Sequence, residues 1–362
     1  MRIGIIGAGQ LGQMLGFAAR ELGHECEFLD PSTNAPAAVC GVVRAAAFDD
    51  QQALRALAGD VDVLTYEFEN VPVAVLEALD GTVPIYPPLD ALKYSQDRLA
   101  EKQLFERLGI PLPAYHPIDS ADDLHAAAAH VGVPLIVKTR RLGYDGKGQY
   151  RIREQAELAT AWDQFNAPNS GADLIAEQWL SFDREVSAIA ARNTDGTIVH
   201  YPLTENVHRD GILHTSRAPV HDGALTTLAN DYIRRLLEHL DYVGTLALEL
   251  FVVGDQLLAN EFAPRVHNSG HWTIEGADCS QFAAHVRAIC GQPLEAIQLN
   301  GHAAMLNLIG TIPEAARSLD EGTLHDYGKE PRPGRKLGHI TVLAAIAAEC
   351  DDKLKTLMQS VN

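Results

Sequence analysis

The chain has 362 residues, more than the roughly 250–300 at which a single hydrophobic core usually stops growing, so we expect two or three domains. Apolar residues make up 46% and charged residues 21% of the chain, which is ordinary globular usage and excludes disordered, collagen-like and disulfide-scaffold proteins. The formal net charge of −19 disfavours binding to nucleic acid or to an anionic membrane, so an anionic substrate needs a local basic pocket.

The cysteines and the apolar stretches indicate in which cellular compartment the protein is expected. The five cysteines show no CxxC spacing, and their odd number leaves one unpaired, so free thiols in a reducing compartment are expected. No stretch reaches the roughly 18 apolar residues of a membrane span, and the N-terminus shows no signal-peptide pattern. These patterns predict a cytoplasmic protein.

The first domain is expected at residues 1–96. Residues 2–6 form an apolar strand pattern, a helical stretch runs to about Leu22, and the next strand ends at Asp30. Strand patterns VDVLTYE and VPIYP follow, with helices near 50–58 and 73–79. This alternation predicts a doubly wound parallel sheet.

A dinucleotide fingerprint opens this domain. Gly7, Gly9 and Gly12 form G-x-G-x-x-G between a strand and a helix, and Asp30 follows about 20 residues later. The motif alone favours NAD. The same glycines also suit a tight turn that binds another phosphate or none, and we expect this second role because a stronger nucleotide signal lies in the middle of the chain.

The second domain is expected at residues 97–296, and the third at 297–362. A helix runs from Asp97 to about Leu108, a strand and a helix at 120–131 follow, and PLIVKT and QYRI form a hairpin around a glycine-rich loop. The patterns DLIAEQW, EVSAIAAR, TIVHYPL, TLALELFVV and QLLANEF, with a helix near 225–240, predict a largely antiparallel sheet. The tail carries a strand at 338–345 and a helix near 349–359.

The hairpin has the composition of a phosphate site. Lys138 ends a strand, and Gly143, Gly146 and Gly148 follow it. Glycine amides that close over phosphates beside an ammonium group would suit ATP. The alternative is a solvated hairpin tip.

Two acidic residues on neighbouring strands suggest a metal site. Glu249 lies in an apolar strand, where an unpaired carboxylate costs several kcal/mol, so we expect it to have a cation or a basic partner. With Glu261 it could hold Mg²⁺ against nucleotide phosphates; the alternative is an ion pair with Arg265. His267 and His271 are four residues apart, but the sequence supplies no evident third zinc ligand, and we expect a loop that presents polar groups to a substrate.

The order of Arg98, Lys138, GYDGKGQ, AEQWL, Glu249 and NEFAPRVHNSGHWT resembles the ATP-grasp superfamily. Within it, the chain is similar to the N5-carboxyaminoimidazole ribonucleotide synthetase family of purine biosynthesis over essentially its whole length. The resemblance implies an α/β protein with an N-terminal doubly wound parallel sheet, a central ATP-grasp α+β domain with a glycine-rich lid at about 115–177, and a small C-terminal domain.

The resemblance also implies the site residues. The expected ATP contacts are Arg98, Lys138, Gly143, Tyr144, Asp145, Gly146, Lys147, Gly148, Gln149, Glu177, Gln178, Trp179, Leu180, Glu185, His208, Asn260 and Glu261. The expected Mg²⁺ ligands are Glu249 and Glu261. The expected substrate contacts are Tyr144, Asp145, Arg265, His267, Asn268, Lys329, Arg335 and Lys336, with Asp145, Lys147 and Arg265 in catalysis. The Asn often found two positions after the second metal Glu is Ala263 here, so a third ligand must come from elsewhere; Asn268 is a candidate.

The implied reaction joins bicarbonate to 5-aminoimidazole ribonucleotide at the expense of ATP, through carboxyphosphate, with ADP and phosphate as products. A homodimer is expected, with small molecules as substrates and no nucleic-acid or membrane partner. Three alternatives stay open: a formate-using glycinamide ribotide transformylase, a nicotinamide oxidoreductase and a non-catalytic nucleotide sensor.

Overall fold

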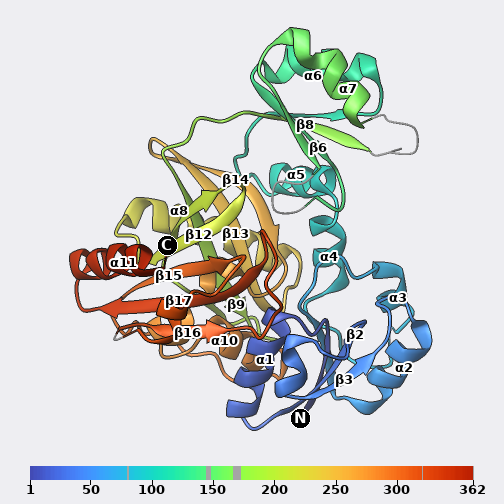
Figure 1. Ribbon diagram of the computed structural model, residues 1–362. Helices are drawn as coiled ribbons and strands as arrows, with labels where there is room; N and C mark the ends of the chain where they lie inside the picture. Colours follow the sequence, from blue (N-terminus) through green and yellow to red (C-terminus); the bar gives the residue numbers. More distant parts are fainter. Residues whose placement is uncertain (80, 144–147, 166–172, 320, 362) are drawn as a thin grey trace.

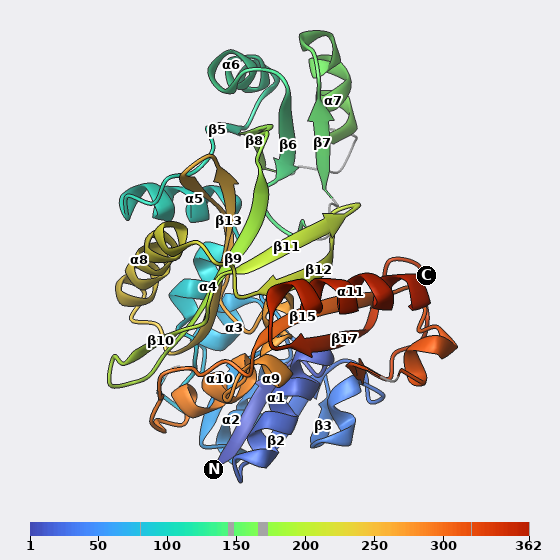
Figure 2. The same cartoon turned by 90° about the vertical axis from the view of Figure 1, so that its left-hand side faces the viewer.

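The computed structural model describes residues 1–362 except 80, 144–147, 166–172, 320 and 362. Figure 1 shows a first domain at the bottom, a central body built on a large sheet, and a smaller lid unit at the top. Figure 2 shows the lid unit rising above the body from the side. No helix in the described part of the chain is long and apolar enough to cross a membrane.

The first domain is a parallel sheet with helices. Its elements are β1 (Arg2–Ile6), α1 (Gln10–Glu21), β2 (Glu25–Asp30), η1 (Pro36–Val39), β3 (Val42–Ala45), α2 (Gln51–Asp60), β4 (Val63–Tyr66), α3 (Val73–Glu77) and α4 (Leu89–Ser95). The strands are parallel in the order β3-β2-β1-β4, so the predicted sheet is confirmed. The predicted strand VPIYP was wrong: only the bridge Leu64–Ile85 forms, because Pro84 and Pro87 have no N–H to donate to a ladder.

The lid unit has its own small sheet and core. Its elements, with the preceding helix, are α5 (Arg98–Arg107), β5 (Tyr115–Ile118), α6 (Ala121–Val131), β6 (Leu135–Thr139), β7 (Gln149–Ile152), η2 (Gln155–Glu157), α7 (Leu158–Phe165) and β8 (Leu174–Gln178). The antiparallel order is β5-β8-β6-β7, which confirms the predicted hairpin. Asp97 caps α5, and its carboxylate accepts from two backbone amides of the first turn. The same Asp97 carboxylate pairs with Arg141, which follows β6, at 3.0 Å, and this contact ties the lid to α5 at its root.

The central body is a single continuous sheet. Its elements are β9 (Arg184–Arg192), β10 (Ile198–His200), β11 (Thr204–Arg209), β12 (Ile212–Ala218), α8 (Gly223–His239), β13 (Gly244–Val253), β14 (Gln256–Ala263), η3 (Asn268–Gly270), α9 (Thr273–Gly276), α10 (Gln281–Ile289), β15 (His302–Ile309), η4 (Glu314–Arg317), β16 (Thr323–Asp326), β17 (Lys336–Ala344) and α11 (Ala347–Val361). The order is β14-β13-β9-β11-β12-β15-β17-β16, with β10 beside β9. The tail strands extend the sheet through the pairing of β12 with β15.

The apolar cores of the body lie between its sheet and the helices that cover it. The face under α8 buries side chains of β9, β13 and β14 together with Leu104 and Phe105 of α5. Helix α11 covers β15 and β17 through Cys350, Leu354 and Leu357. The first domain packs on α10, where Val286 and Ile289 join the core of α1. The body thus packs on α8 and α5, on α11 at the tail and, through α10, on the first domain.

Candidate active site

A cleft of about 560 Å³ opens where α5, the lid, the body sheet and the first domain meet. Residues from all four regions line it. Of the residues predicted from the sequence, the cleft brings together Arg98, Lys138, Gly143, Gln149, Trp179, Glu185, His208, Glu249, Asn260, Glu261, Arg265, His267, Asn268 and Lys336. The nucleotide, metal and acceptor predictions thus fall on a single cavity.

Other predicted residues lie elsewhere. Tyr144, Asp145, Gly146 and Lys147 lie outside the described residues. The residues absent from the cleft lining are Gly148, Glu177, Gln178, Leu180, Lys329 and Arg335. Of these, Glu177 accepts a hydrogen bond from Lys138, which lines the cleft. Lys329 and Arg335 lie in the segment before β17.

A buried charge cluster supports the lid side of the cleft. Glu177 Oε2 lies 2.8 Å from Lys138 Nζ and 3.6 Å from Lys102 Nζ. Burial alone would raise the pKa of Glu177, but Lys102 and Lys138 outweigh it and lower that pKa to about 2. Burial lowers the pKa of Lys138, against the attraction of Glu177. Lys102 also donates to the Asn260 carbonyl at 3.0 Å, so one lysine that the sequence reasoning missed joins the lid to β14.

The two predicted metal carboxylates face each other across two strands. Glu249 on β13 is the cross-strand partner of Glu261 on β14. Glu249 Oε1 lies 3.0 Å from His267 Nε2, and Glu261 Oε2 lies 3.0 Å from Arg98. Burial would raise the pKa of Glu249, yet its hydrogen bond with His267 and the attraction of nearby cations lower it to about 2. The predicted basic partner of Glu249 is confirmed, and it is His267.

These donors fit a hard divalent cation. Two carboxylates side by side at the edge of an open cleft supply oxygen ligands of the kind that Mg²⁺ prefers. Asn268 is less suited as a third ligand, because its amide pairs reciprocally with the amide of Asn307 at 2.7 and 3.1 Å. That pairing fixes the start of η3 against β15.

Glu101 is a second acidic residue of α5 that the sequence reasoning missed. It is buried, and its Oε1 accepts from the Phe262 amide at 2.8 Å. Burial, with the nearby charge of Glu261, raises the pKa of Glu101 to about 8. Glu101 therefore clamps the backbone directly after the metal carboxylate Glu261.

An ion pair joins the first domain to the body. The Arg265 guanidinium binds Glu69, which follows β4, so the alternative pairing of Arg265 with Glu249 is not what forms. Burial would raise the pKa of Glu69, but Arg265 lowers it. Glu69 and Asn70 both line the cleft. Acidic and amide side chains just beyond the carboxyl end of a parallel strand were the signal available for them.

A histidine–carboxylate pair lies on β9 and β11. His208 Nδ1 is 2.5 Å from Glu185 Oε2. Burial lowers the pKa of His208, but the hydrogen bond and charge of Glu185 outweigh it and raise that pKa. Nearby, the Phe182 and Phe251 rings stack at 4.8 Å, so this end of the cleft combines an apolar wall with charged groups.

The tail bases approach the first domain. Lys329 hydrogen-bonds the Gln10 side chain at the start of α1, and its ammonium lies 5.9 Å from the Tyr327 ring centroid. Burial, followed by repulsion from Arg335 and other nearby cations, lowers the pKa of Lys329 to about 8. Of the predicted basic cluster, Lys329 thus contacts the start of α1, whereas Lys336 lines the cleft.

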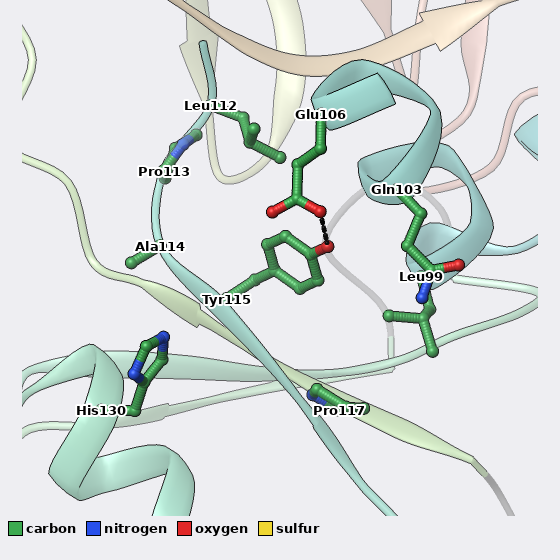
Figure 3. A pocket seen from close by; sticks show the side chains of 9 residues that line it. All are labelled: Leu99, Gln103, Glu106, Leu112, Pro113, Ala114, Tyr115, Pro117 and His130. Carbon is green, nitrogen blue, oxygen red and sulfur yellow. Dashed lines mark hydrogen bonds between the residues drawn. The ribbon is translucent and has the colours of Figure 1, made fainter. Parts of the chain in front are cut away.

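A separate pocket of about 330 Å³ lies at the root of the lid (Figure 3). Its walls come from α5 and from the strand that leads into the lid, and Leu112 and Pro113 form its apolar side. The Tyr115 hydroxyl donates to Glu106 Oε2 at 2.8 Å, which joins β5 to α5.

Comparison with known proteins agrees with this geometry. Three family models match successive parts of the chain: a ribonucleotide synthetase preATP-grasp domain at residues 1–96, an ATP-grasp domain at 103–282 and a phosphoribosylaminoimidazole carboxylase C-terminal domain at 303–353. The N5-carboxyaminoimidazole ribonucleotide synthase of Pseudomonas aeruginosa is 47% identical over 347 residues, 95% of this chain and 95% of that protein.

Solved structures extend the similarity. The N5-carboxyaminoimidazole ribonucleotide synthetase of Thermus thermophilus is 46% identical, with a TM-score of 0.93 over 99% of this chain and 98% of that one. The synthase of Aspergillus clavatus, solved with ADP and 5-aminoimidazole ribonucleotide, is 30% identical, with a TM-score of 0.90 over 99% and 98%. The chain belongs to the N5-carboxyaminoimidazole ribonucleotide synthase family and is an ATP-grasp ligase.

Proposed function

We propose that this enzyme carboxylates 5-aminoimidazole ribonucleotide with bicarbonate and ATP, giving N5-carboxyaminoimidazole ribonucleotide, ADP and phosphate in purine biosynthesis. The observation that carries the proposal is the single cleft in which Lys138, Glu249 and Arg265 meet. A nucleotide phosphate, its metal ion and an acceptor can then be held within one enclosed space. The Aspergillus clavatus relative, whose structure contains ADP and the ribonucleotide, supports the same pair of ligands here.

The nucleotide side belongs to residues 97–296. Lys138 and Arg98 supply positive charge for the phosphates, and Trp179, Phe182 and Phe251 supply an apolar wall for the base. Glu177 acts from below by holding Lys138. Glu249 and Glu261 would hold Mg²⁺, which supplies electrostatic stabilisation of the transferring phosphoryl group. His267 and Arg98 each contact one oxygen of these carboxylates, so a metal ion would compete with them for those oxygens.

The acceptor side lies between the first domain and the tail. Arg265, held by Glu69, and His267 lie next to the metal carboxylates, where bicarbonate and the exocyclic amine would meet. The ribotide phosphate is assigned to Lys329, Arg335 and Lys336, since charged donors grip phosphate well. Asp145 and Lys147 are proposed to assist proton transfer at the amine and to close the cleft. Exclusion of water matters because carboxyphosphate hydrolyses readily.

Three finer points belong to the same proposal. Bicarbonate is the carboxyl donor and Mg²⁺ the metal ion. The protein acts in the cytoplasm, which the free cysteines support. The working form is a homodimer, which size-exclusion chromatography with light scattering tests directly.

The decisive experiment measures ADP release with bicarbonate and the ribonucleotide omitted in turn. We expect strong stimulation by the ribonucleotide and a product whose carboxyl carbon comes from labelled bicarbonate. Equal turnover with formate and glycinamide ribotide would move the enzyme to the transformylase alternative. Binding of ATP without turnover under any of these conditions would favour a nucleotide sensor.

A further inference from the structure

We propose that the glycine turn at the start of α1 is a carboxylate-binding site that this chain fills with its own Glu67. The Gly9 amide donates to Glu67 Oε1 at 2.5 Å, and the Gly12 amide donates to Oε2 at 2.6 Å. One carboxylate therefore takes two backbone donors of the fingerprint. It comes from the loop after β4, 58 residues along the chain from Gly9.

The turn is shaped around this carboxylate. A Cβ at Gly7 would lie 2.5 Å from Glu67 Cγ, and a Cβ at Gly9 would lie 2.6 Å from Oε1. Gly7 also has φ +99°, a conformation that side chains with a Cβ avoid. The glycines of the motif are needed here because Glu67 lies against them.

Burial and the helix terminus act in opposite directions on the charge of Glu67, and burial leaves its pKa raised. Helix α1 has twelve residues, and its N-cap, Gly9, has no side chain to accept from the first-turn amides. A negative charge is stabilised at such an end by the exposed N–H groups and the helix dipole. Burial raises the pKa of Glu67, and the amides of Gly12 and Gly9 oppose that rise. Glu67 therefore acts as the cap that the helix sequence lacks.

The second part of the dinucleotide fingerprint is also satisfied within the chain. Asp30 Oδ2 accepts from the Ala8 amide at 3.0 Å, and Oδ1 accepts from the Ser32 amide at 2.8 Å. In a dinucleotide-binding domain, the acidic residue at this position binds the ribose hydroxyls and the glycine turn faces the pyrophosphate. Both groups are engaged here, which excludes a dinucleotide from the first domain.

Glu67 is thereby a positioning residue for the active site. It fixes the start of the loop that carries Glu69, which holds Arg265 at the cleft. It also lies near Lys329, whose charge lowers the pKa of Glu67. One internal carboxylate thus fills the glycine turn and fixes the start of the loop that holds Arg265 at the cleft.

The test is refilling of the site by a small carboxylate. In the full-length Glu67→Ala variant, two amide donors lose their acceptor and a space of carboxylate size opens beside them. Formate should raise the melting temperature of this variant in a saturable way at constant ionic strength. The unchanged protein and Glu77→Ala, which removes an exposed carboxylate paired with Lys93, should respond only as they do to chloride. Glu67→Gln should also stay unresponsive, because its amide fills the space.

Several results would overturn the proposal. The first is an equal formate response of Glu67→Ala and the unchanged protein. If Glu67→Ala is not folded after purification, its refolding from denaturant with and without formate is compared, and no gain from formate also counts against the site. Micromolar binding of NAD to the unchanged protein in calorimetry would be a third contrary result. In kinetics, Glu67→Gln should raise the ribonucleotide KM while the ATP KM stays within about twofold, a split that general destabilisation does not produce.

Discussion

Two glycine-rich segments of this protein look alike in sequence and differ in what surrounds them. The turn at residues 7–12 directs its amides at Glu67 and so closes on the chain itself. The segment at 143–149 begins at the cleft, where the Gly143 carbonyl accepts from Arg98 at 3.5 Å and Gly143 lines the cavity. An acidic side chain thus fills the first turn, whereas the second segment begins beside a basic side chain at the cleft.

The contrast divides the enzyme into a nucleotide side and an acceptor side. Substitutions among the cleft carboxylates should abolish turnover. Substitutions near the first domain should weaken binding of the ribonucleotide or lower the stability of the protein, and leave ATP binding unchanged. If the division holds, each variant should change either turnover as a whole or the kinetics of only one substrate.

Removing a metal carboxylate should have the largest effect. Glu249→Gln or Glu261→Gln removes a charge that, in the proposed function, holds Mg²⁺ against the phosphates, so kcat for ADP release should fall about 10³-fold or more, equivalent to several kcal/mol. Glu77→Gln, on the outside of α3, serves as the control and should keep full activity. A fully active double variant at positions 249 and 261 would contradict the metal role.

A buried histidine at the junction of the two sides should make stability depend on pH. His285 Nε2 lies 2.9 Å from Thr65 Oγ1 on β4, and His285 Nδ1 accepts from the Thr245 amide on β13 at 3.1 Å. Burial lowers the pKa of His285 from 6.5 to about 4. Between these values the unfolded chain binds more protons, so this group's contribution to stability falls as the pH drops from 6.5 to 4.

The lowered pKa of His285 also sets the size of this pH-dependent stability change. The difference of 6.5 − 4 pH units corresponds to about 3 kcal/mol at about 1.4 kcal/mol per unit. Denaturant unfolding at pH 7 and pH 4.5 should show a smaller loss for His285→Gln than for the unchanged chain. His125→Gln on the exposed side of α6 is the control. Equal pH dependence of all three proteins would mean that His285 accepts a proton in the folded state.

The basic cluster should separate the two substrates. Arg335→Ala and Lys329→Met should raise the ribonucleotide KM about 10- to 100-fold, which is the effect of about 1.5–3 kcal/mol for a hydrogen bond to a charged group, and leave the ATP KM nearly unchanged. The lowered pKa of Lys329, about 8, means that its ammonium is lost as pH rises through that value. Ribonucleotide kcat/KM should therefore fall above pH 8, and Lys329→Arg should remove that fall.

The KM values of these variants are measured at constant ionic strength, because salt weakens exposed charge contacts. An unchanged ribonucleotide KM in the Arg335→Ala, Lys336→Ala double variant would leave Arg265 as the better phosphate ligand. A parallel rise in the ATP KM would contradict the division into two sides.

The sequence predicted most of the elements and many of the residues that line the cleft, because both depend on local patterns and on motif order. It did not reveal the partners that hold the site, because those contacts join distant positions. Arg265 and Glu69 are 196 residues apart, and Lys138 and Glu177 are 39 apart. Glu101 and Lys102 lie on α5 among other charged residues, and only the packing of α5 on β14 shows that they are buried. The role of Glu67 could not be predicted for the same reason, because Glu67 lies 58 residues from Gly9 and is not part of the glycine motif.

The smallest predicted effect concerns the root of the lid. Tyr115 on β5 donates to Glu106 on α5 in the separate pocket at the root of the lid (Figure 3). Tyr115→Phe removes one hydrogen bond at a solvent-accessible place, so unfolding free energy should fall by about 0.5–1 kcal/mol. The ATP KM should change less than threefold, because Lys102 on α5 still joins Glu177 of the lid to the Asn260 carbonyl on β14. Glu106→Gln is the matched variant, since its amide oxygen can still accept from the tyrosine, and it should lose less stability than Tyr115→Phe. A tenfold change in the ATP KM for Tyr115→Phe, measured by ADP release at saturating ribonucleotide, would show that this contact sets the position of the lid and that the buried cluster around Glu177 does not suffice to hold it.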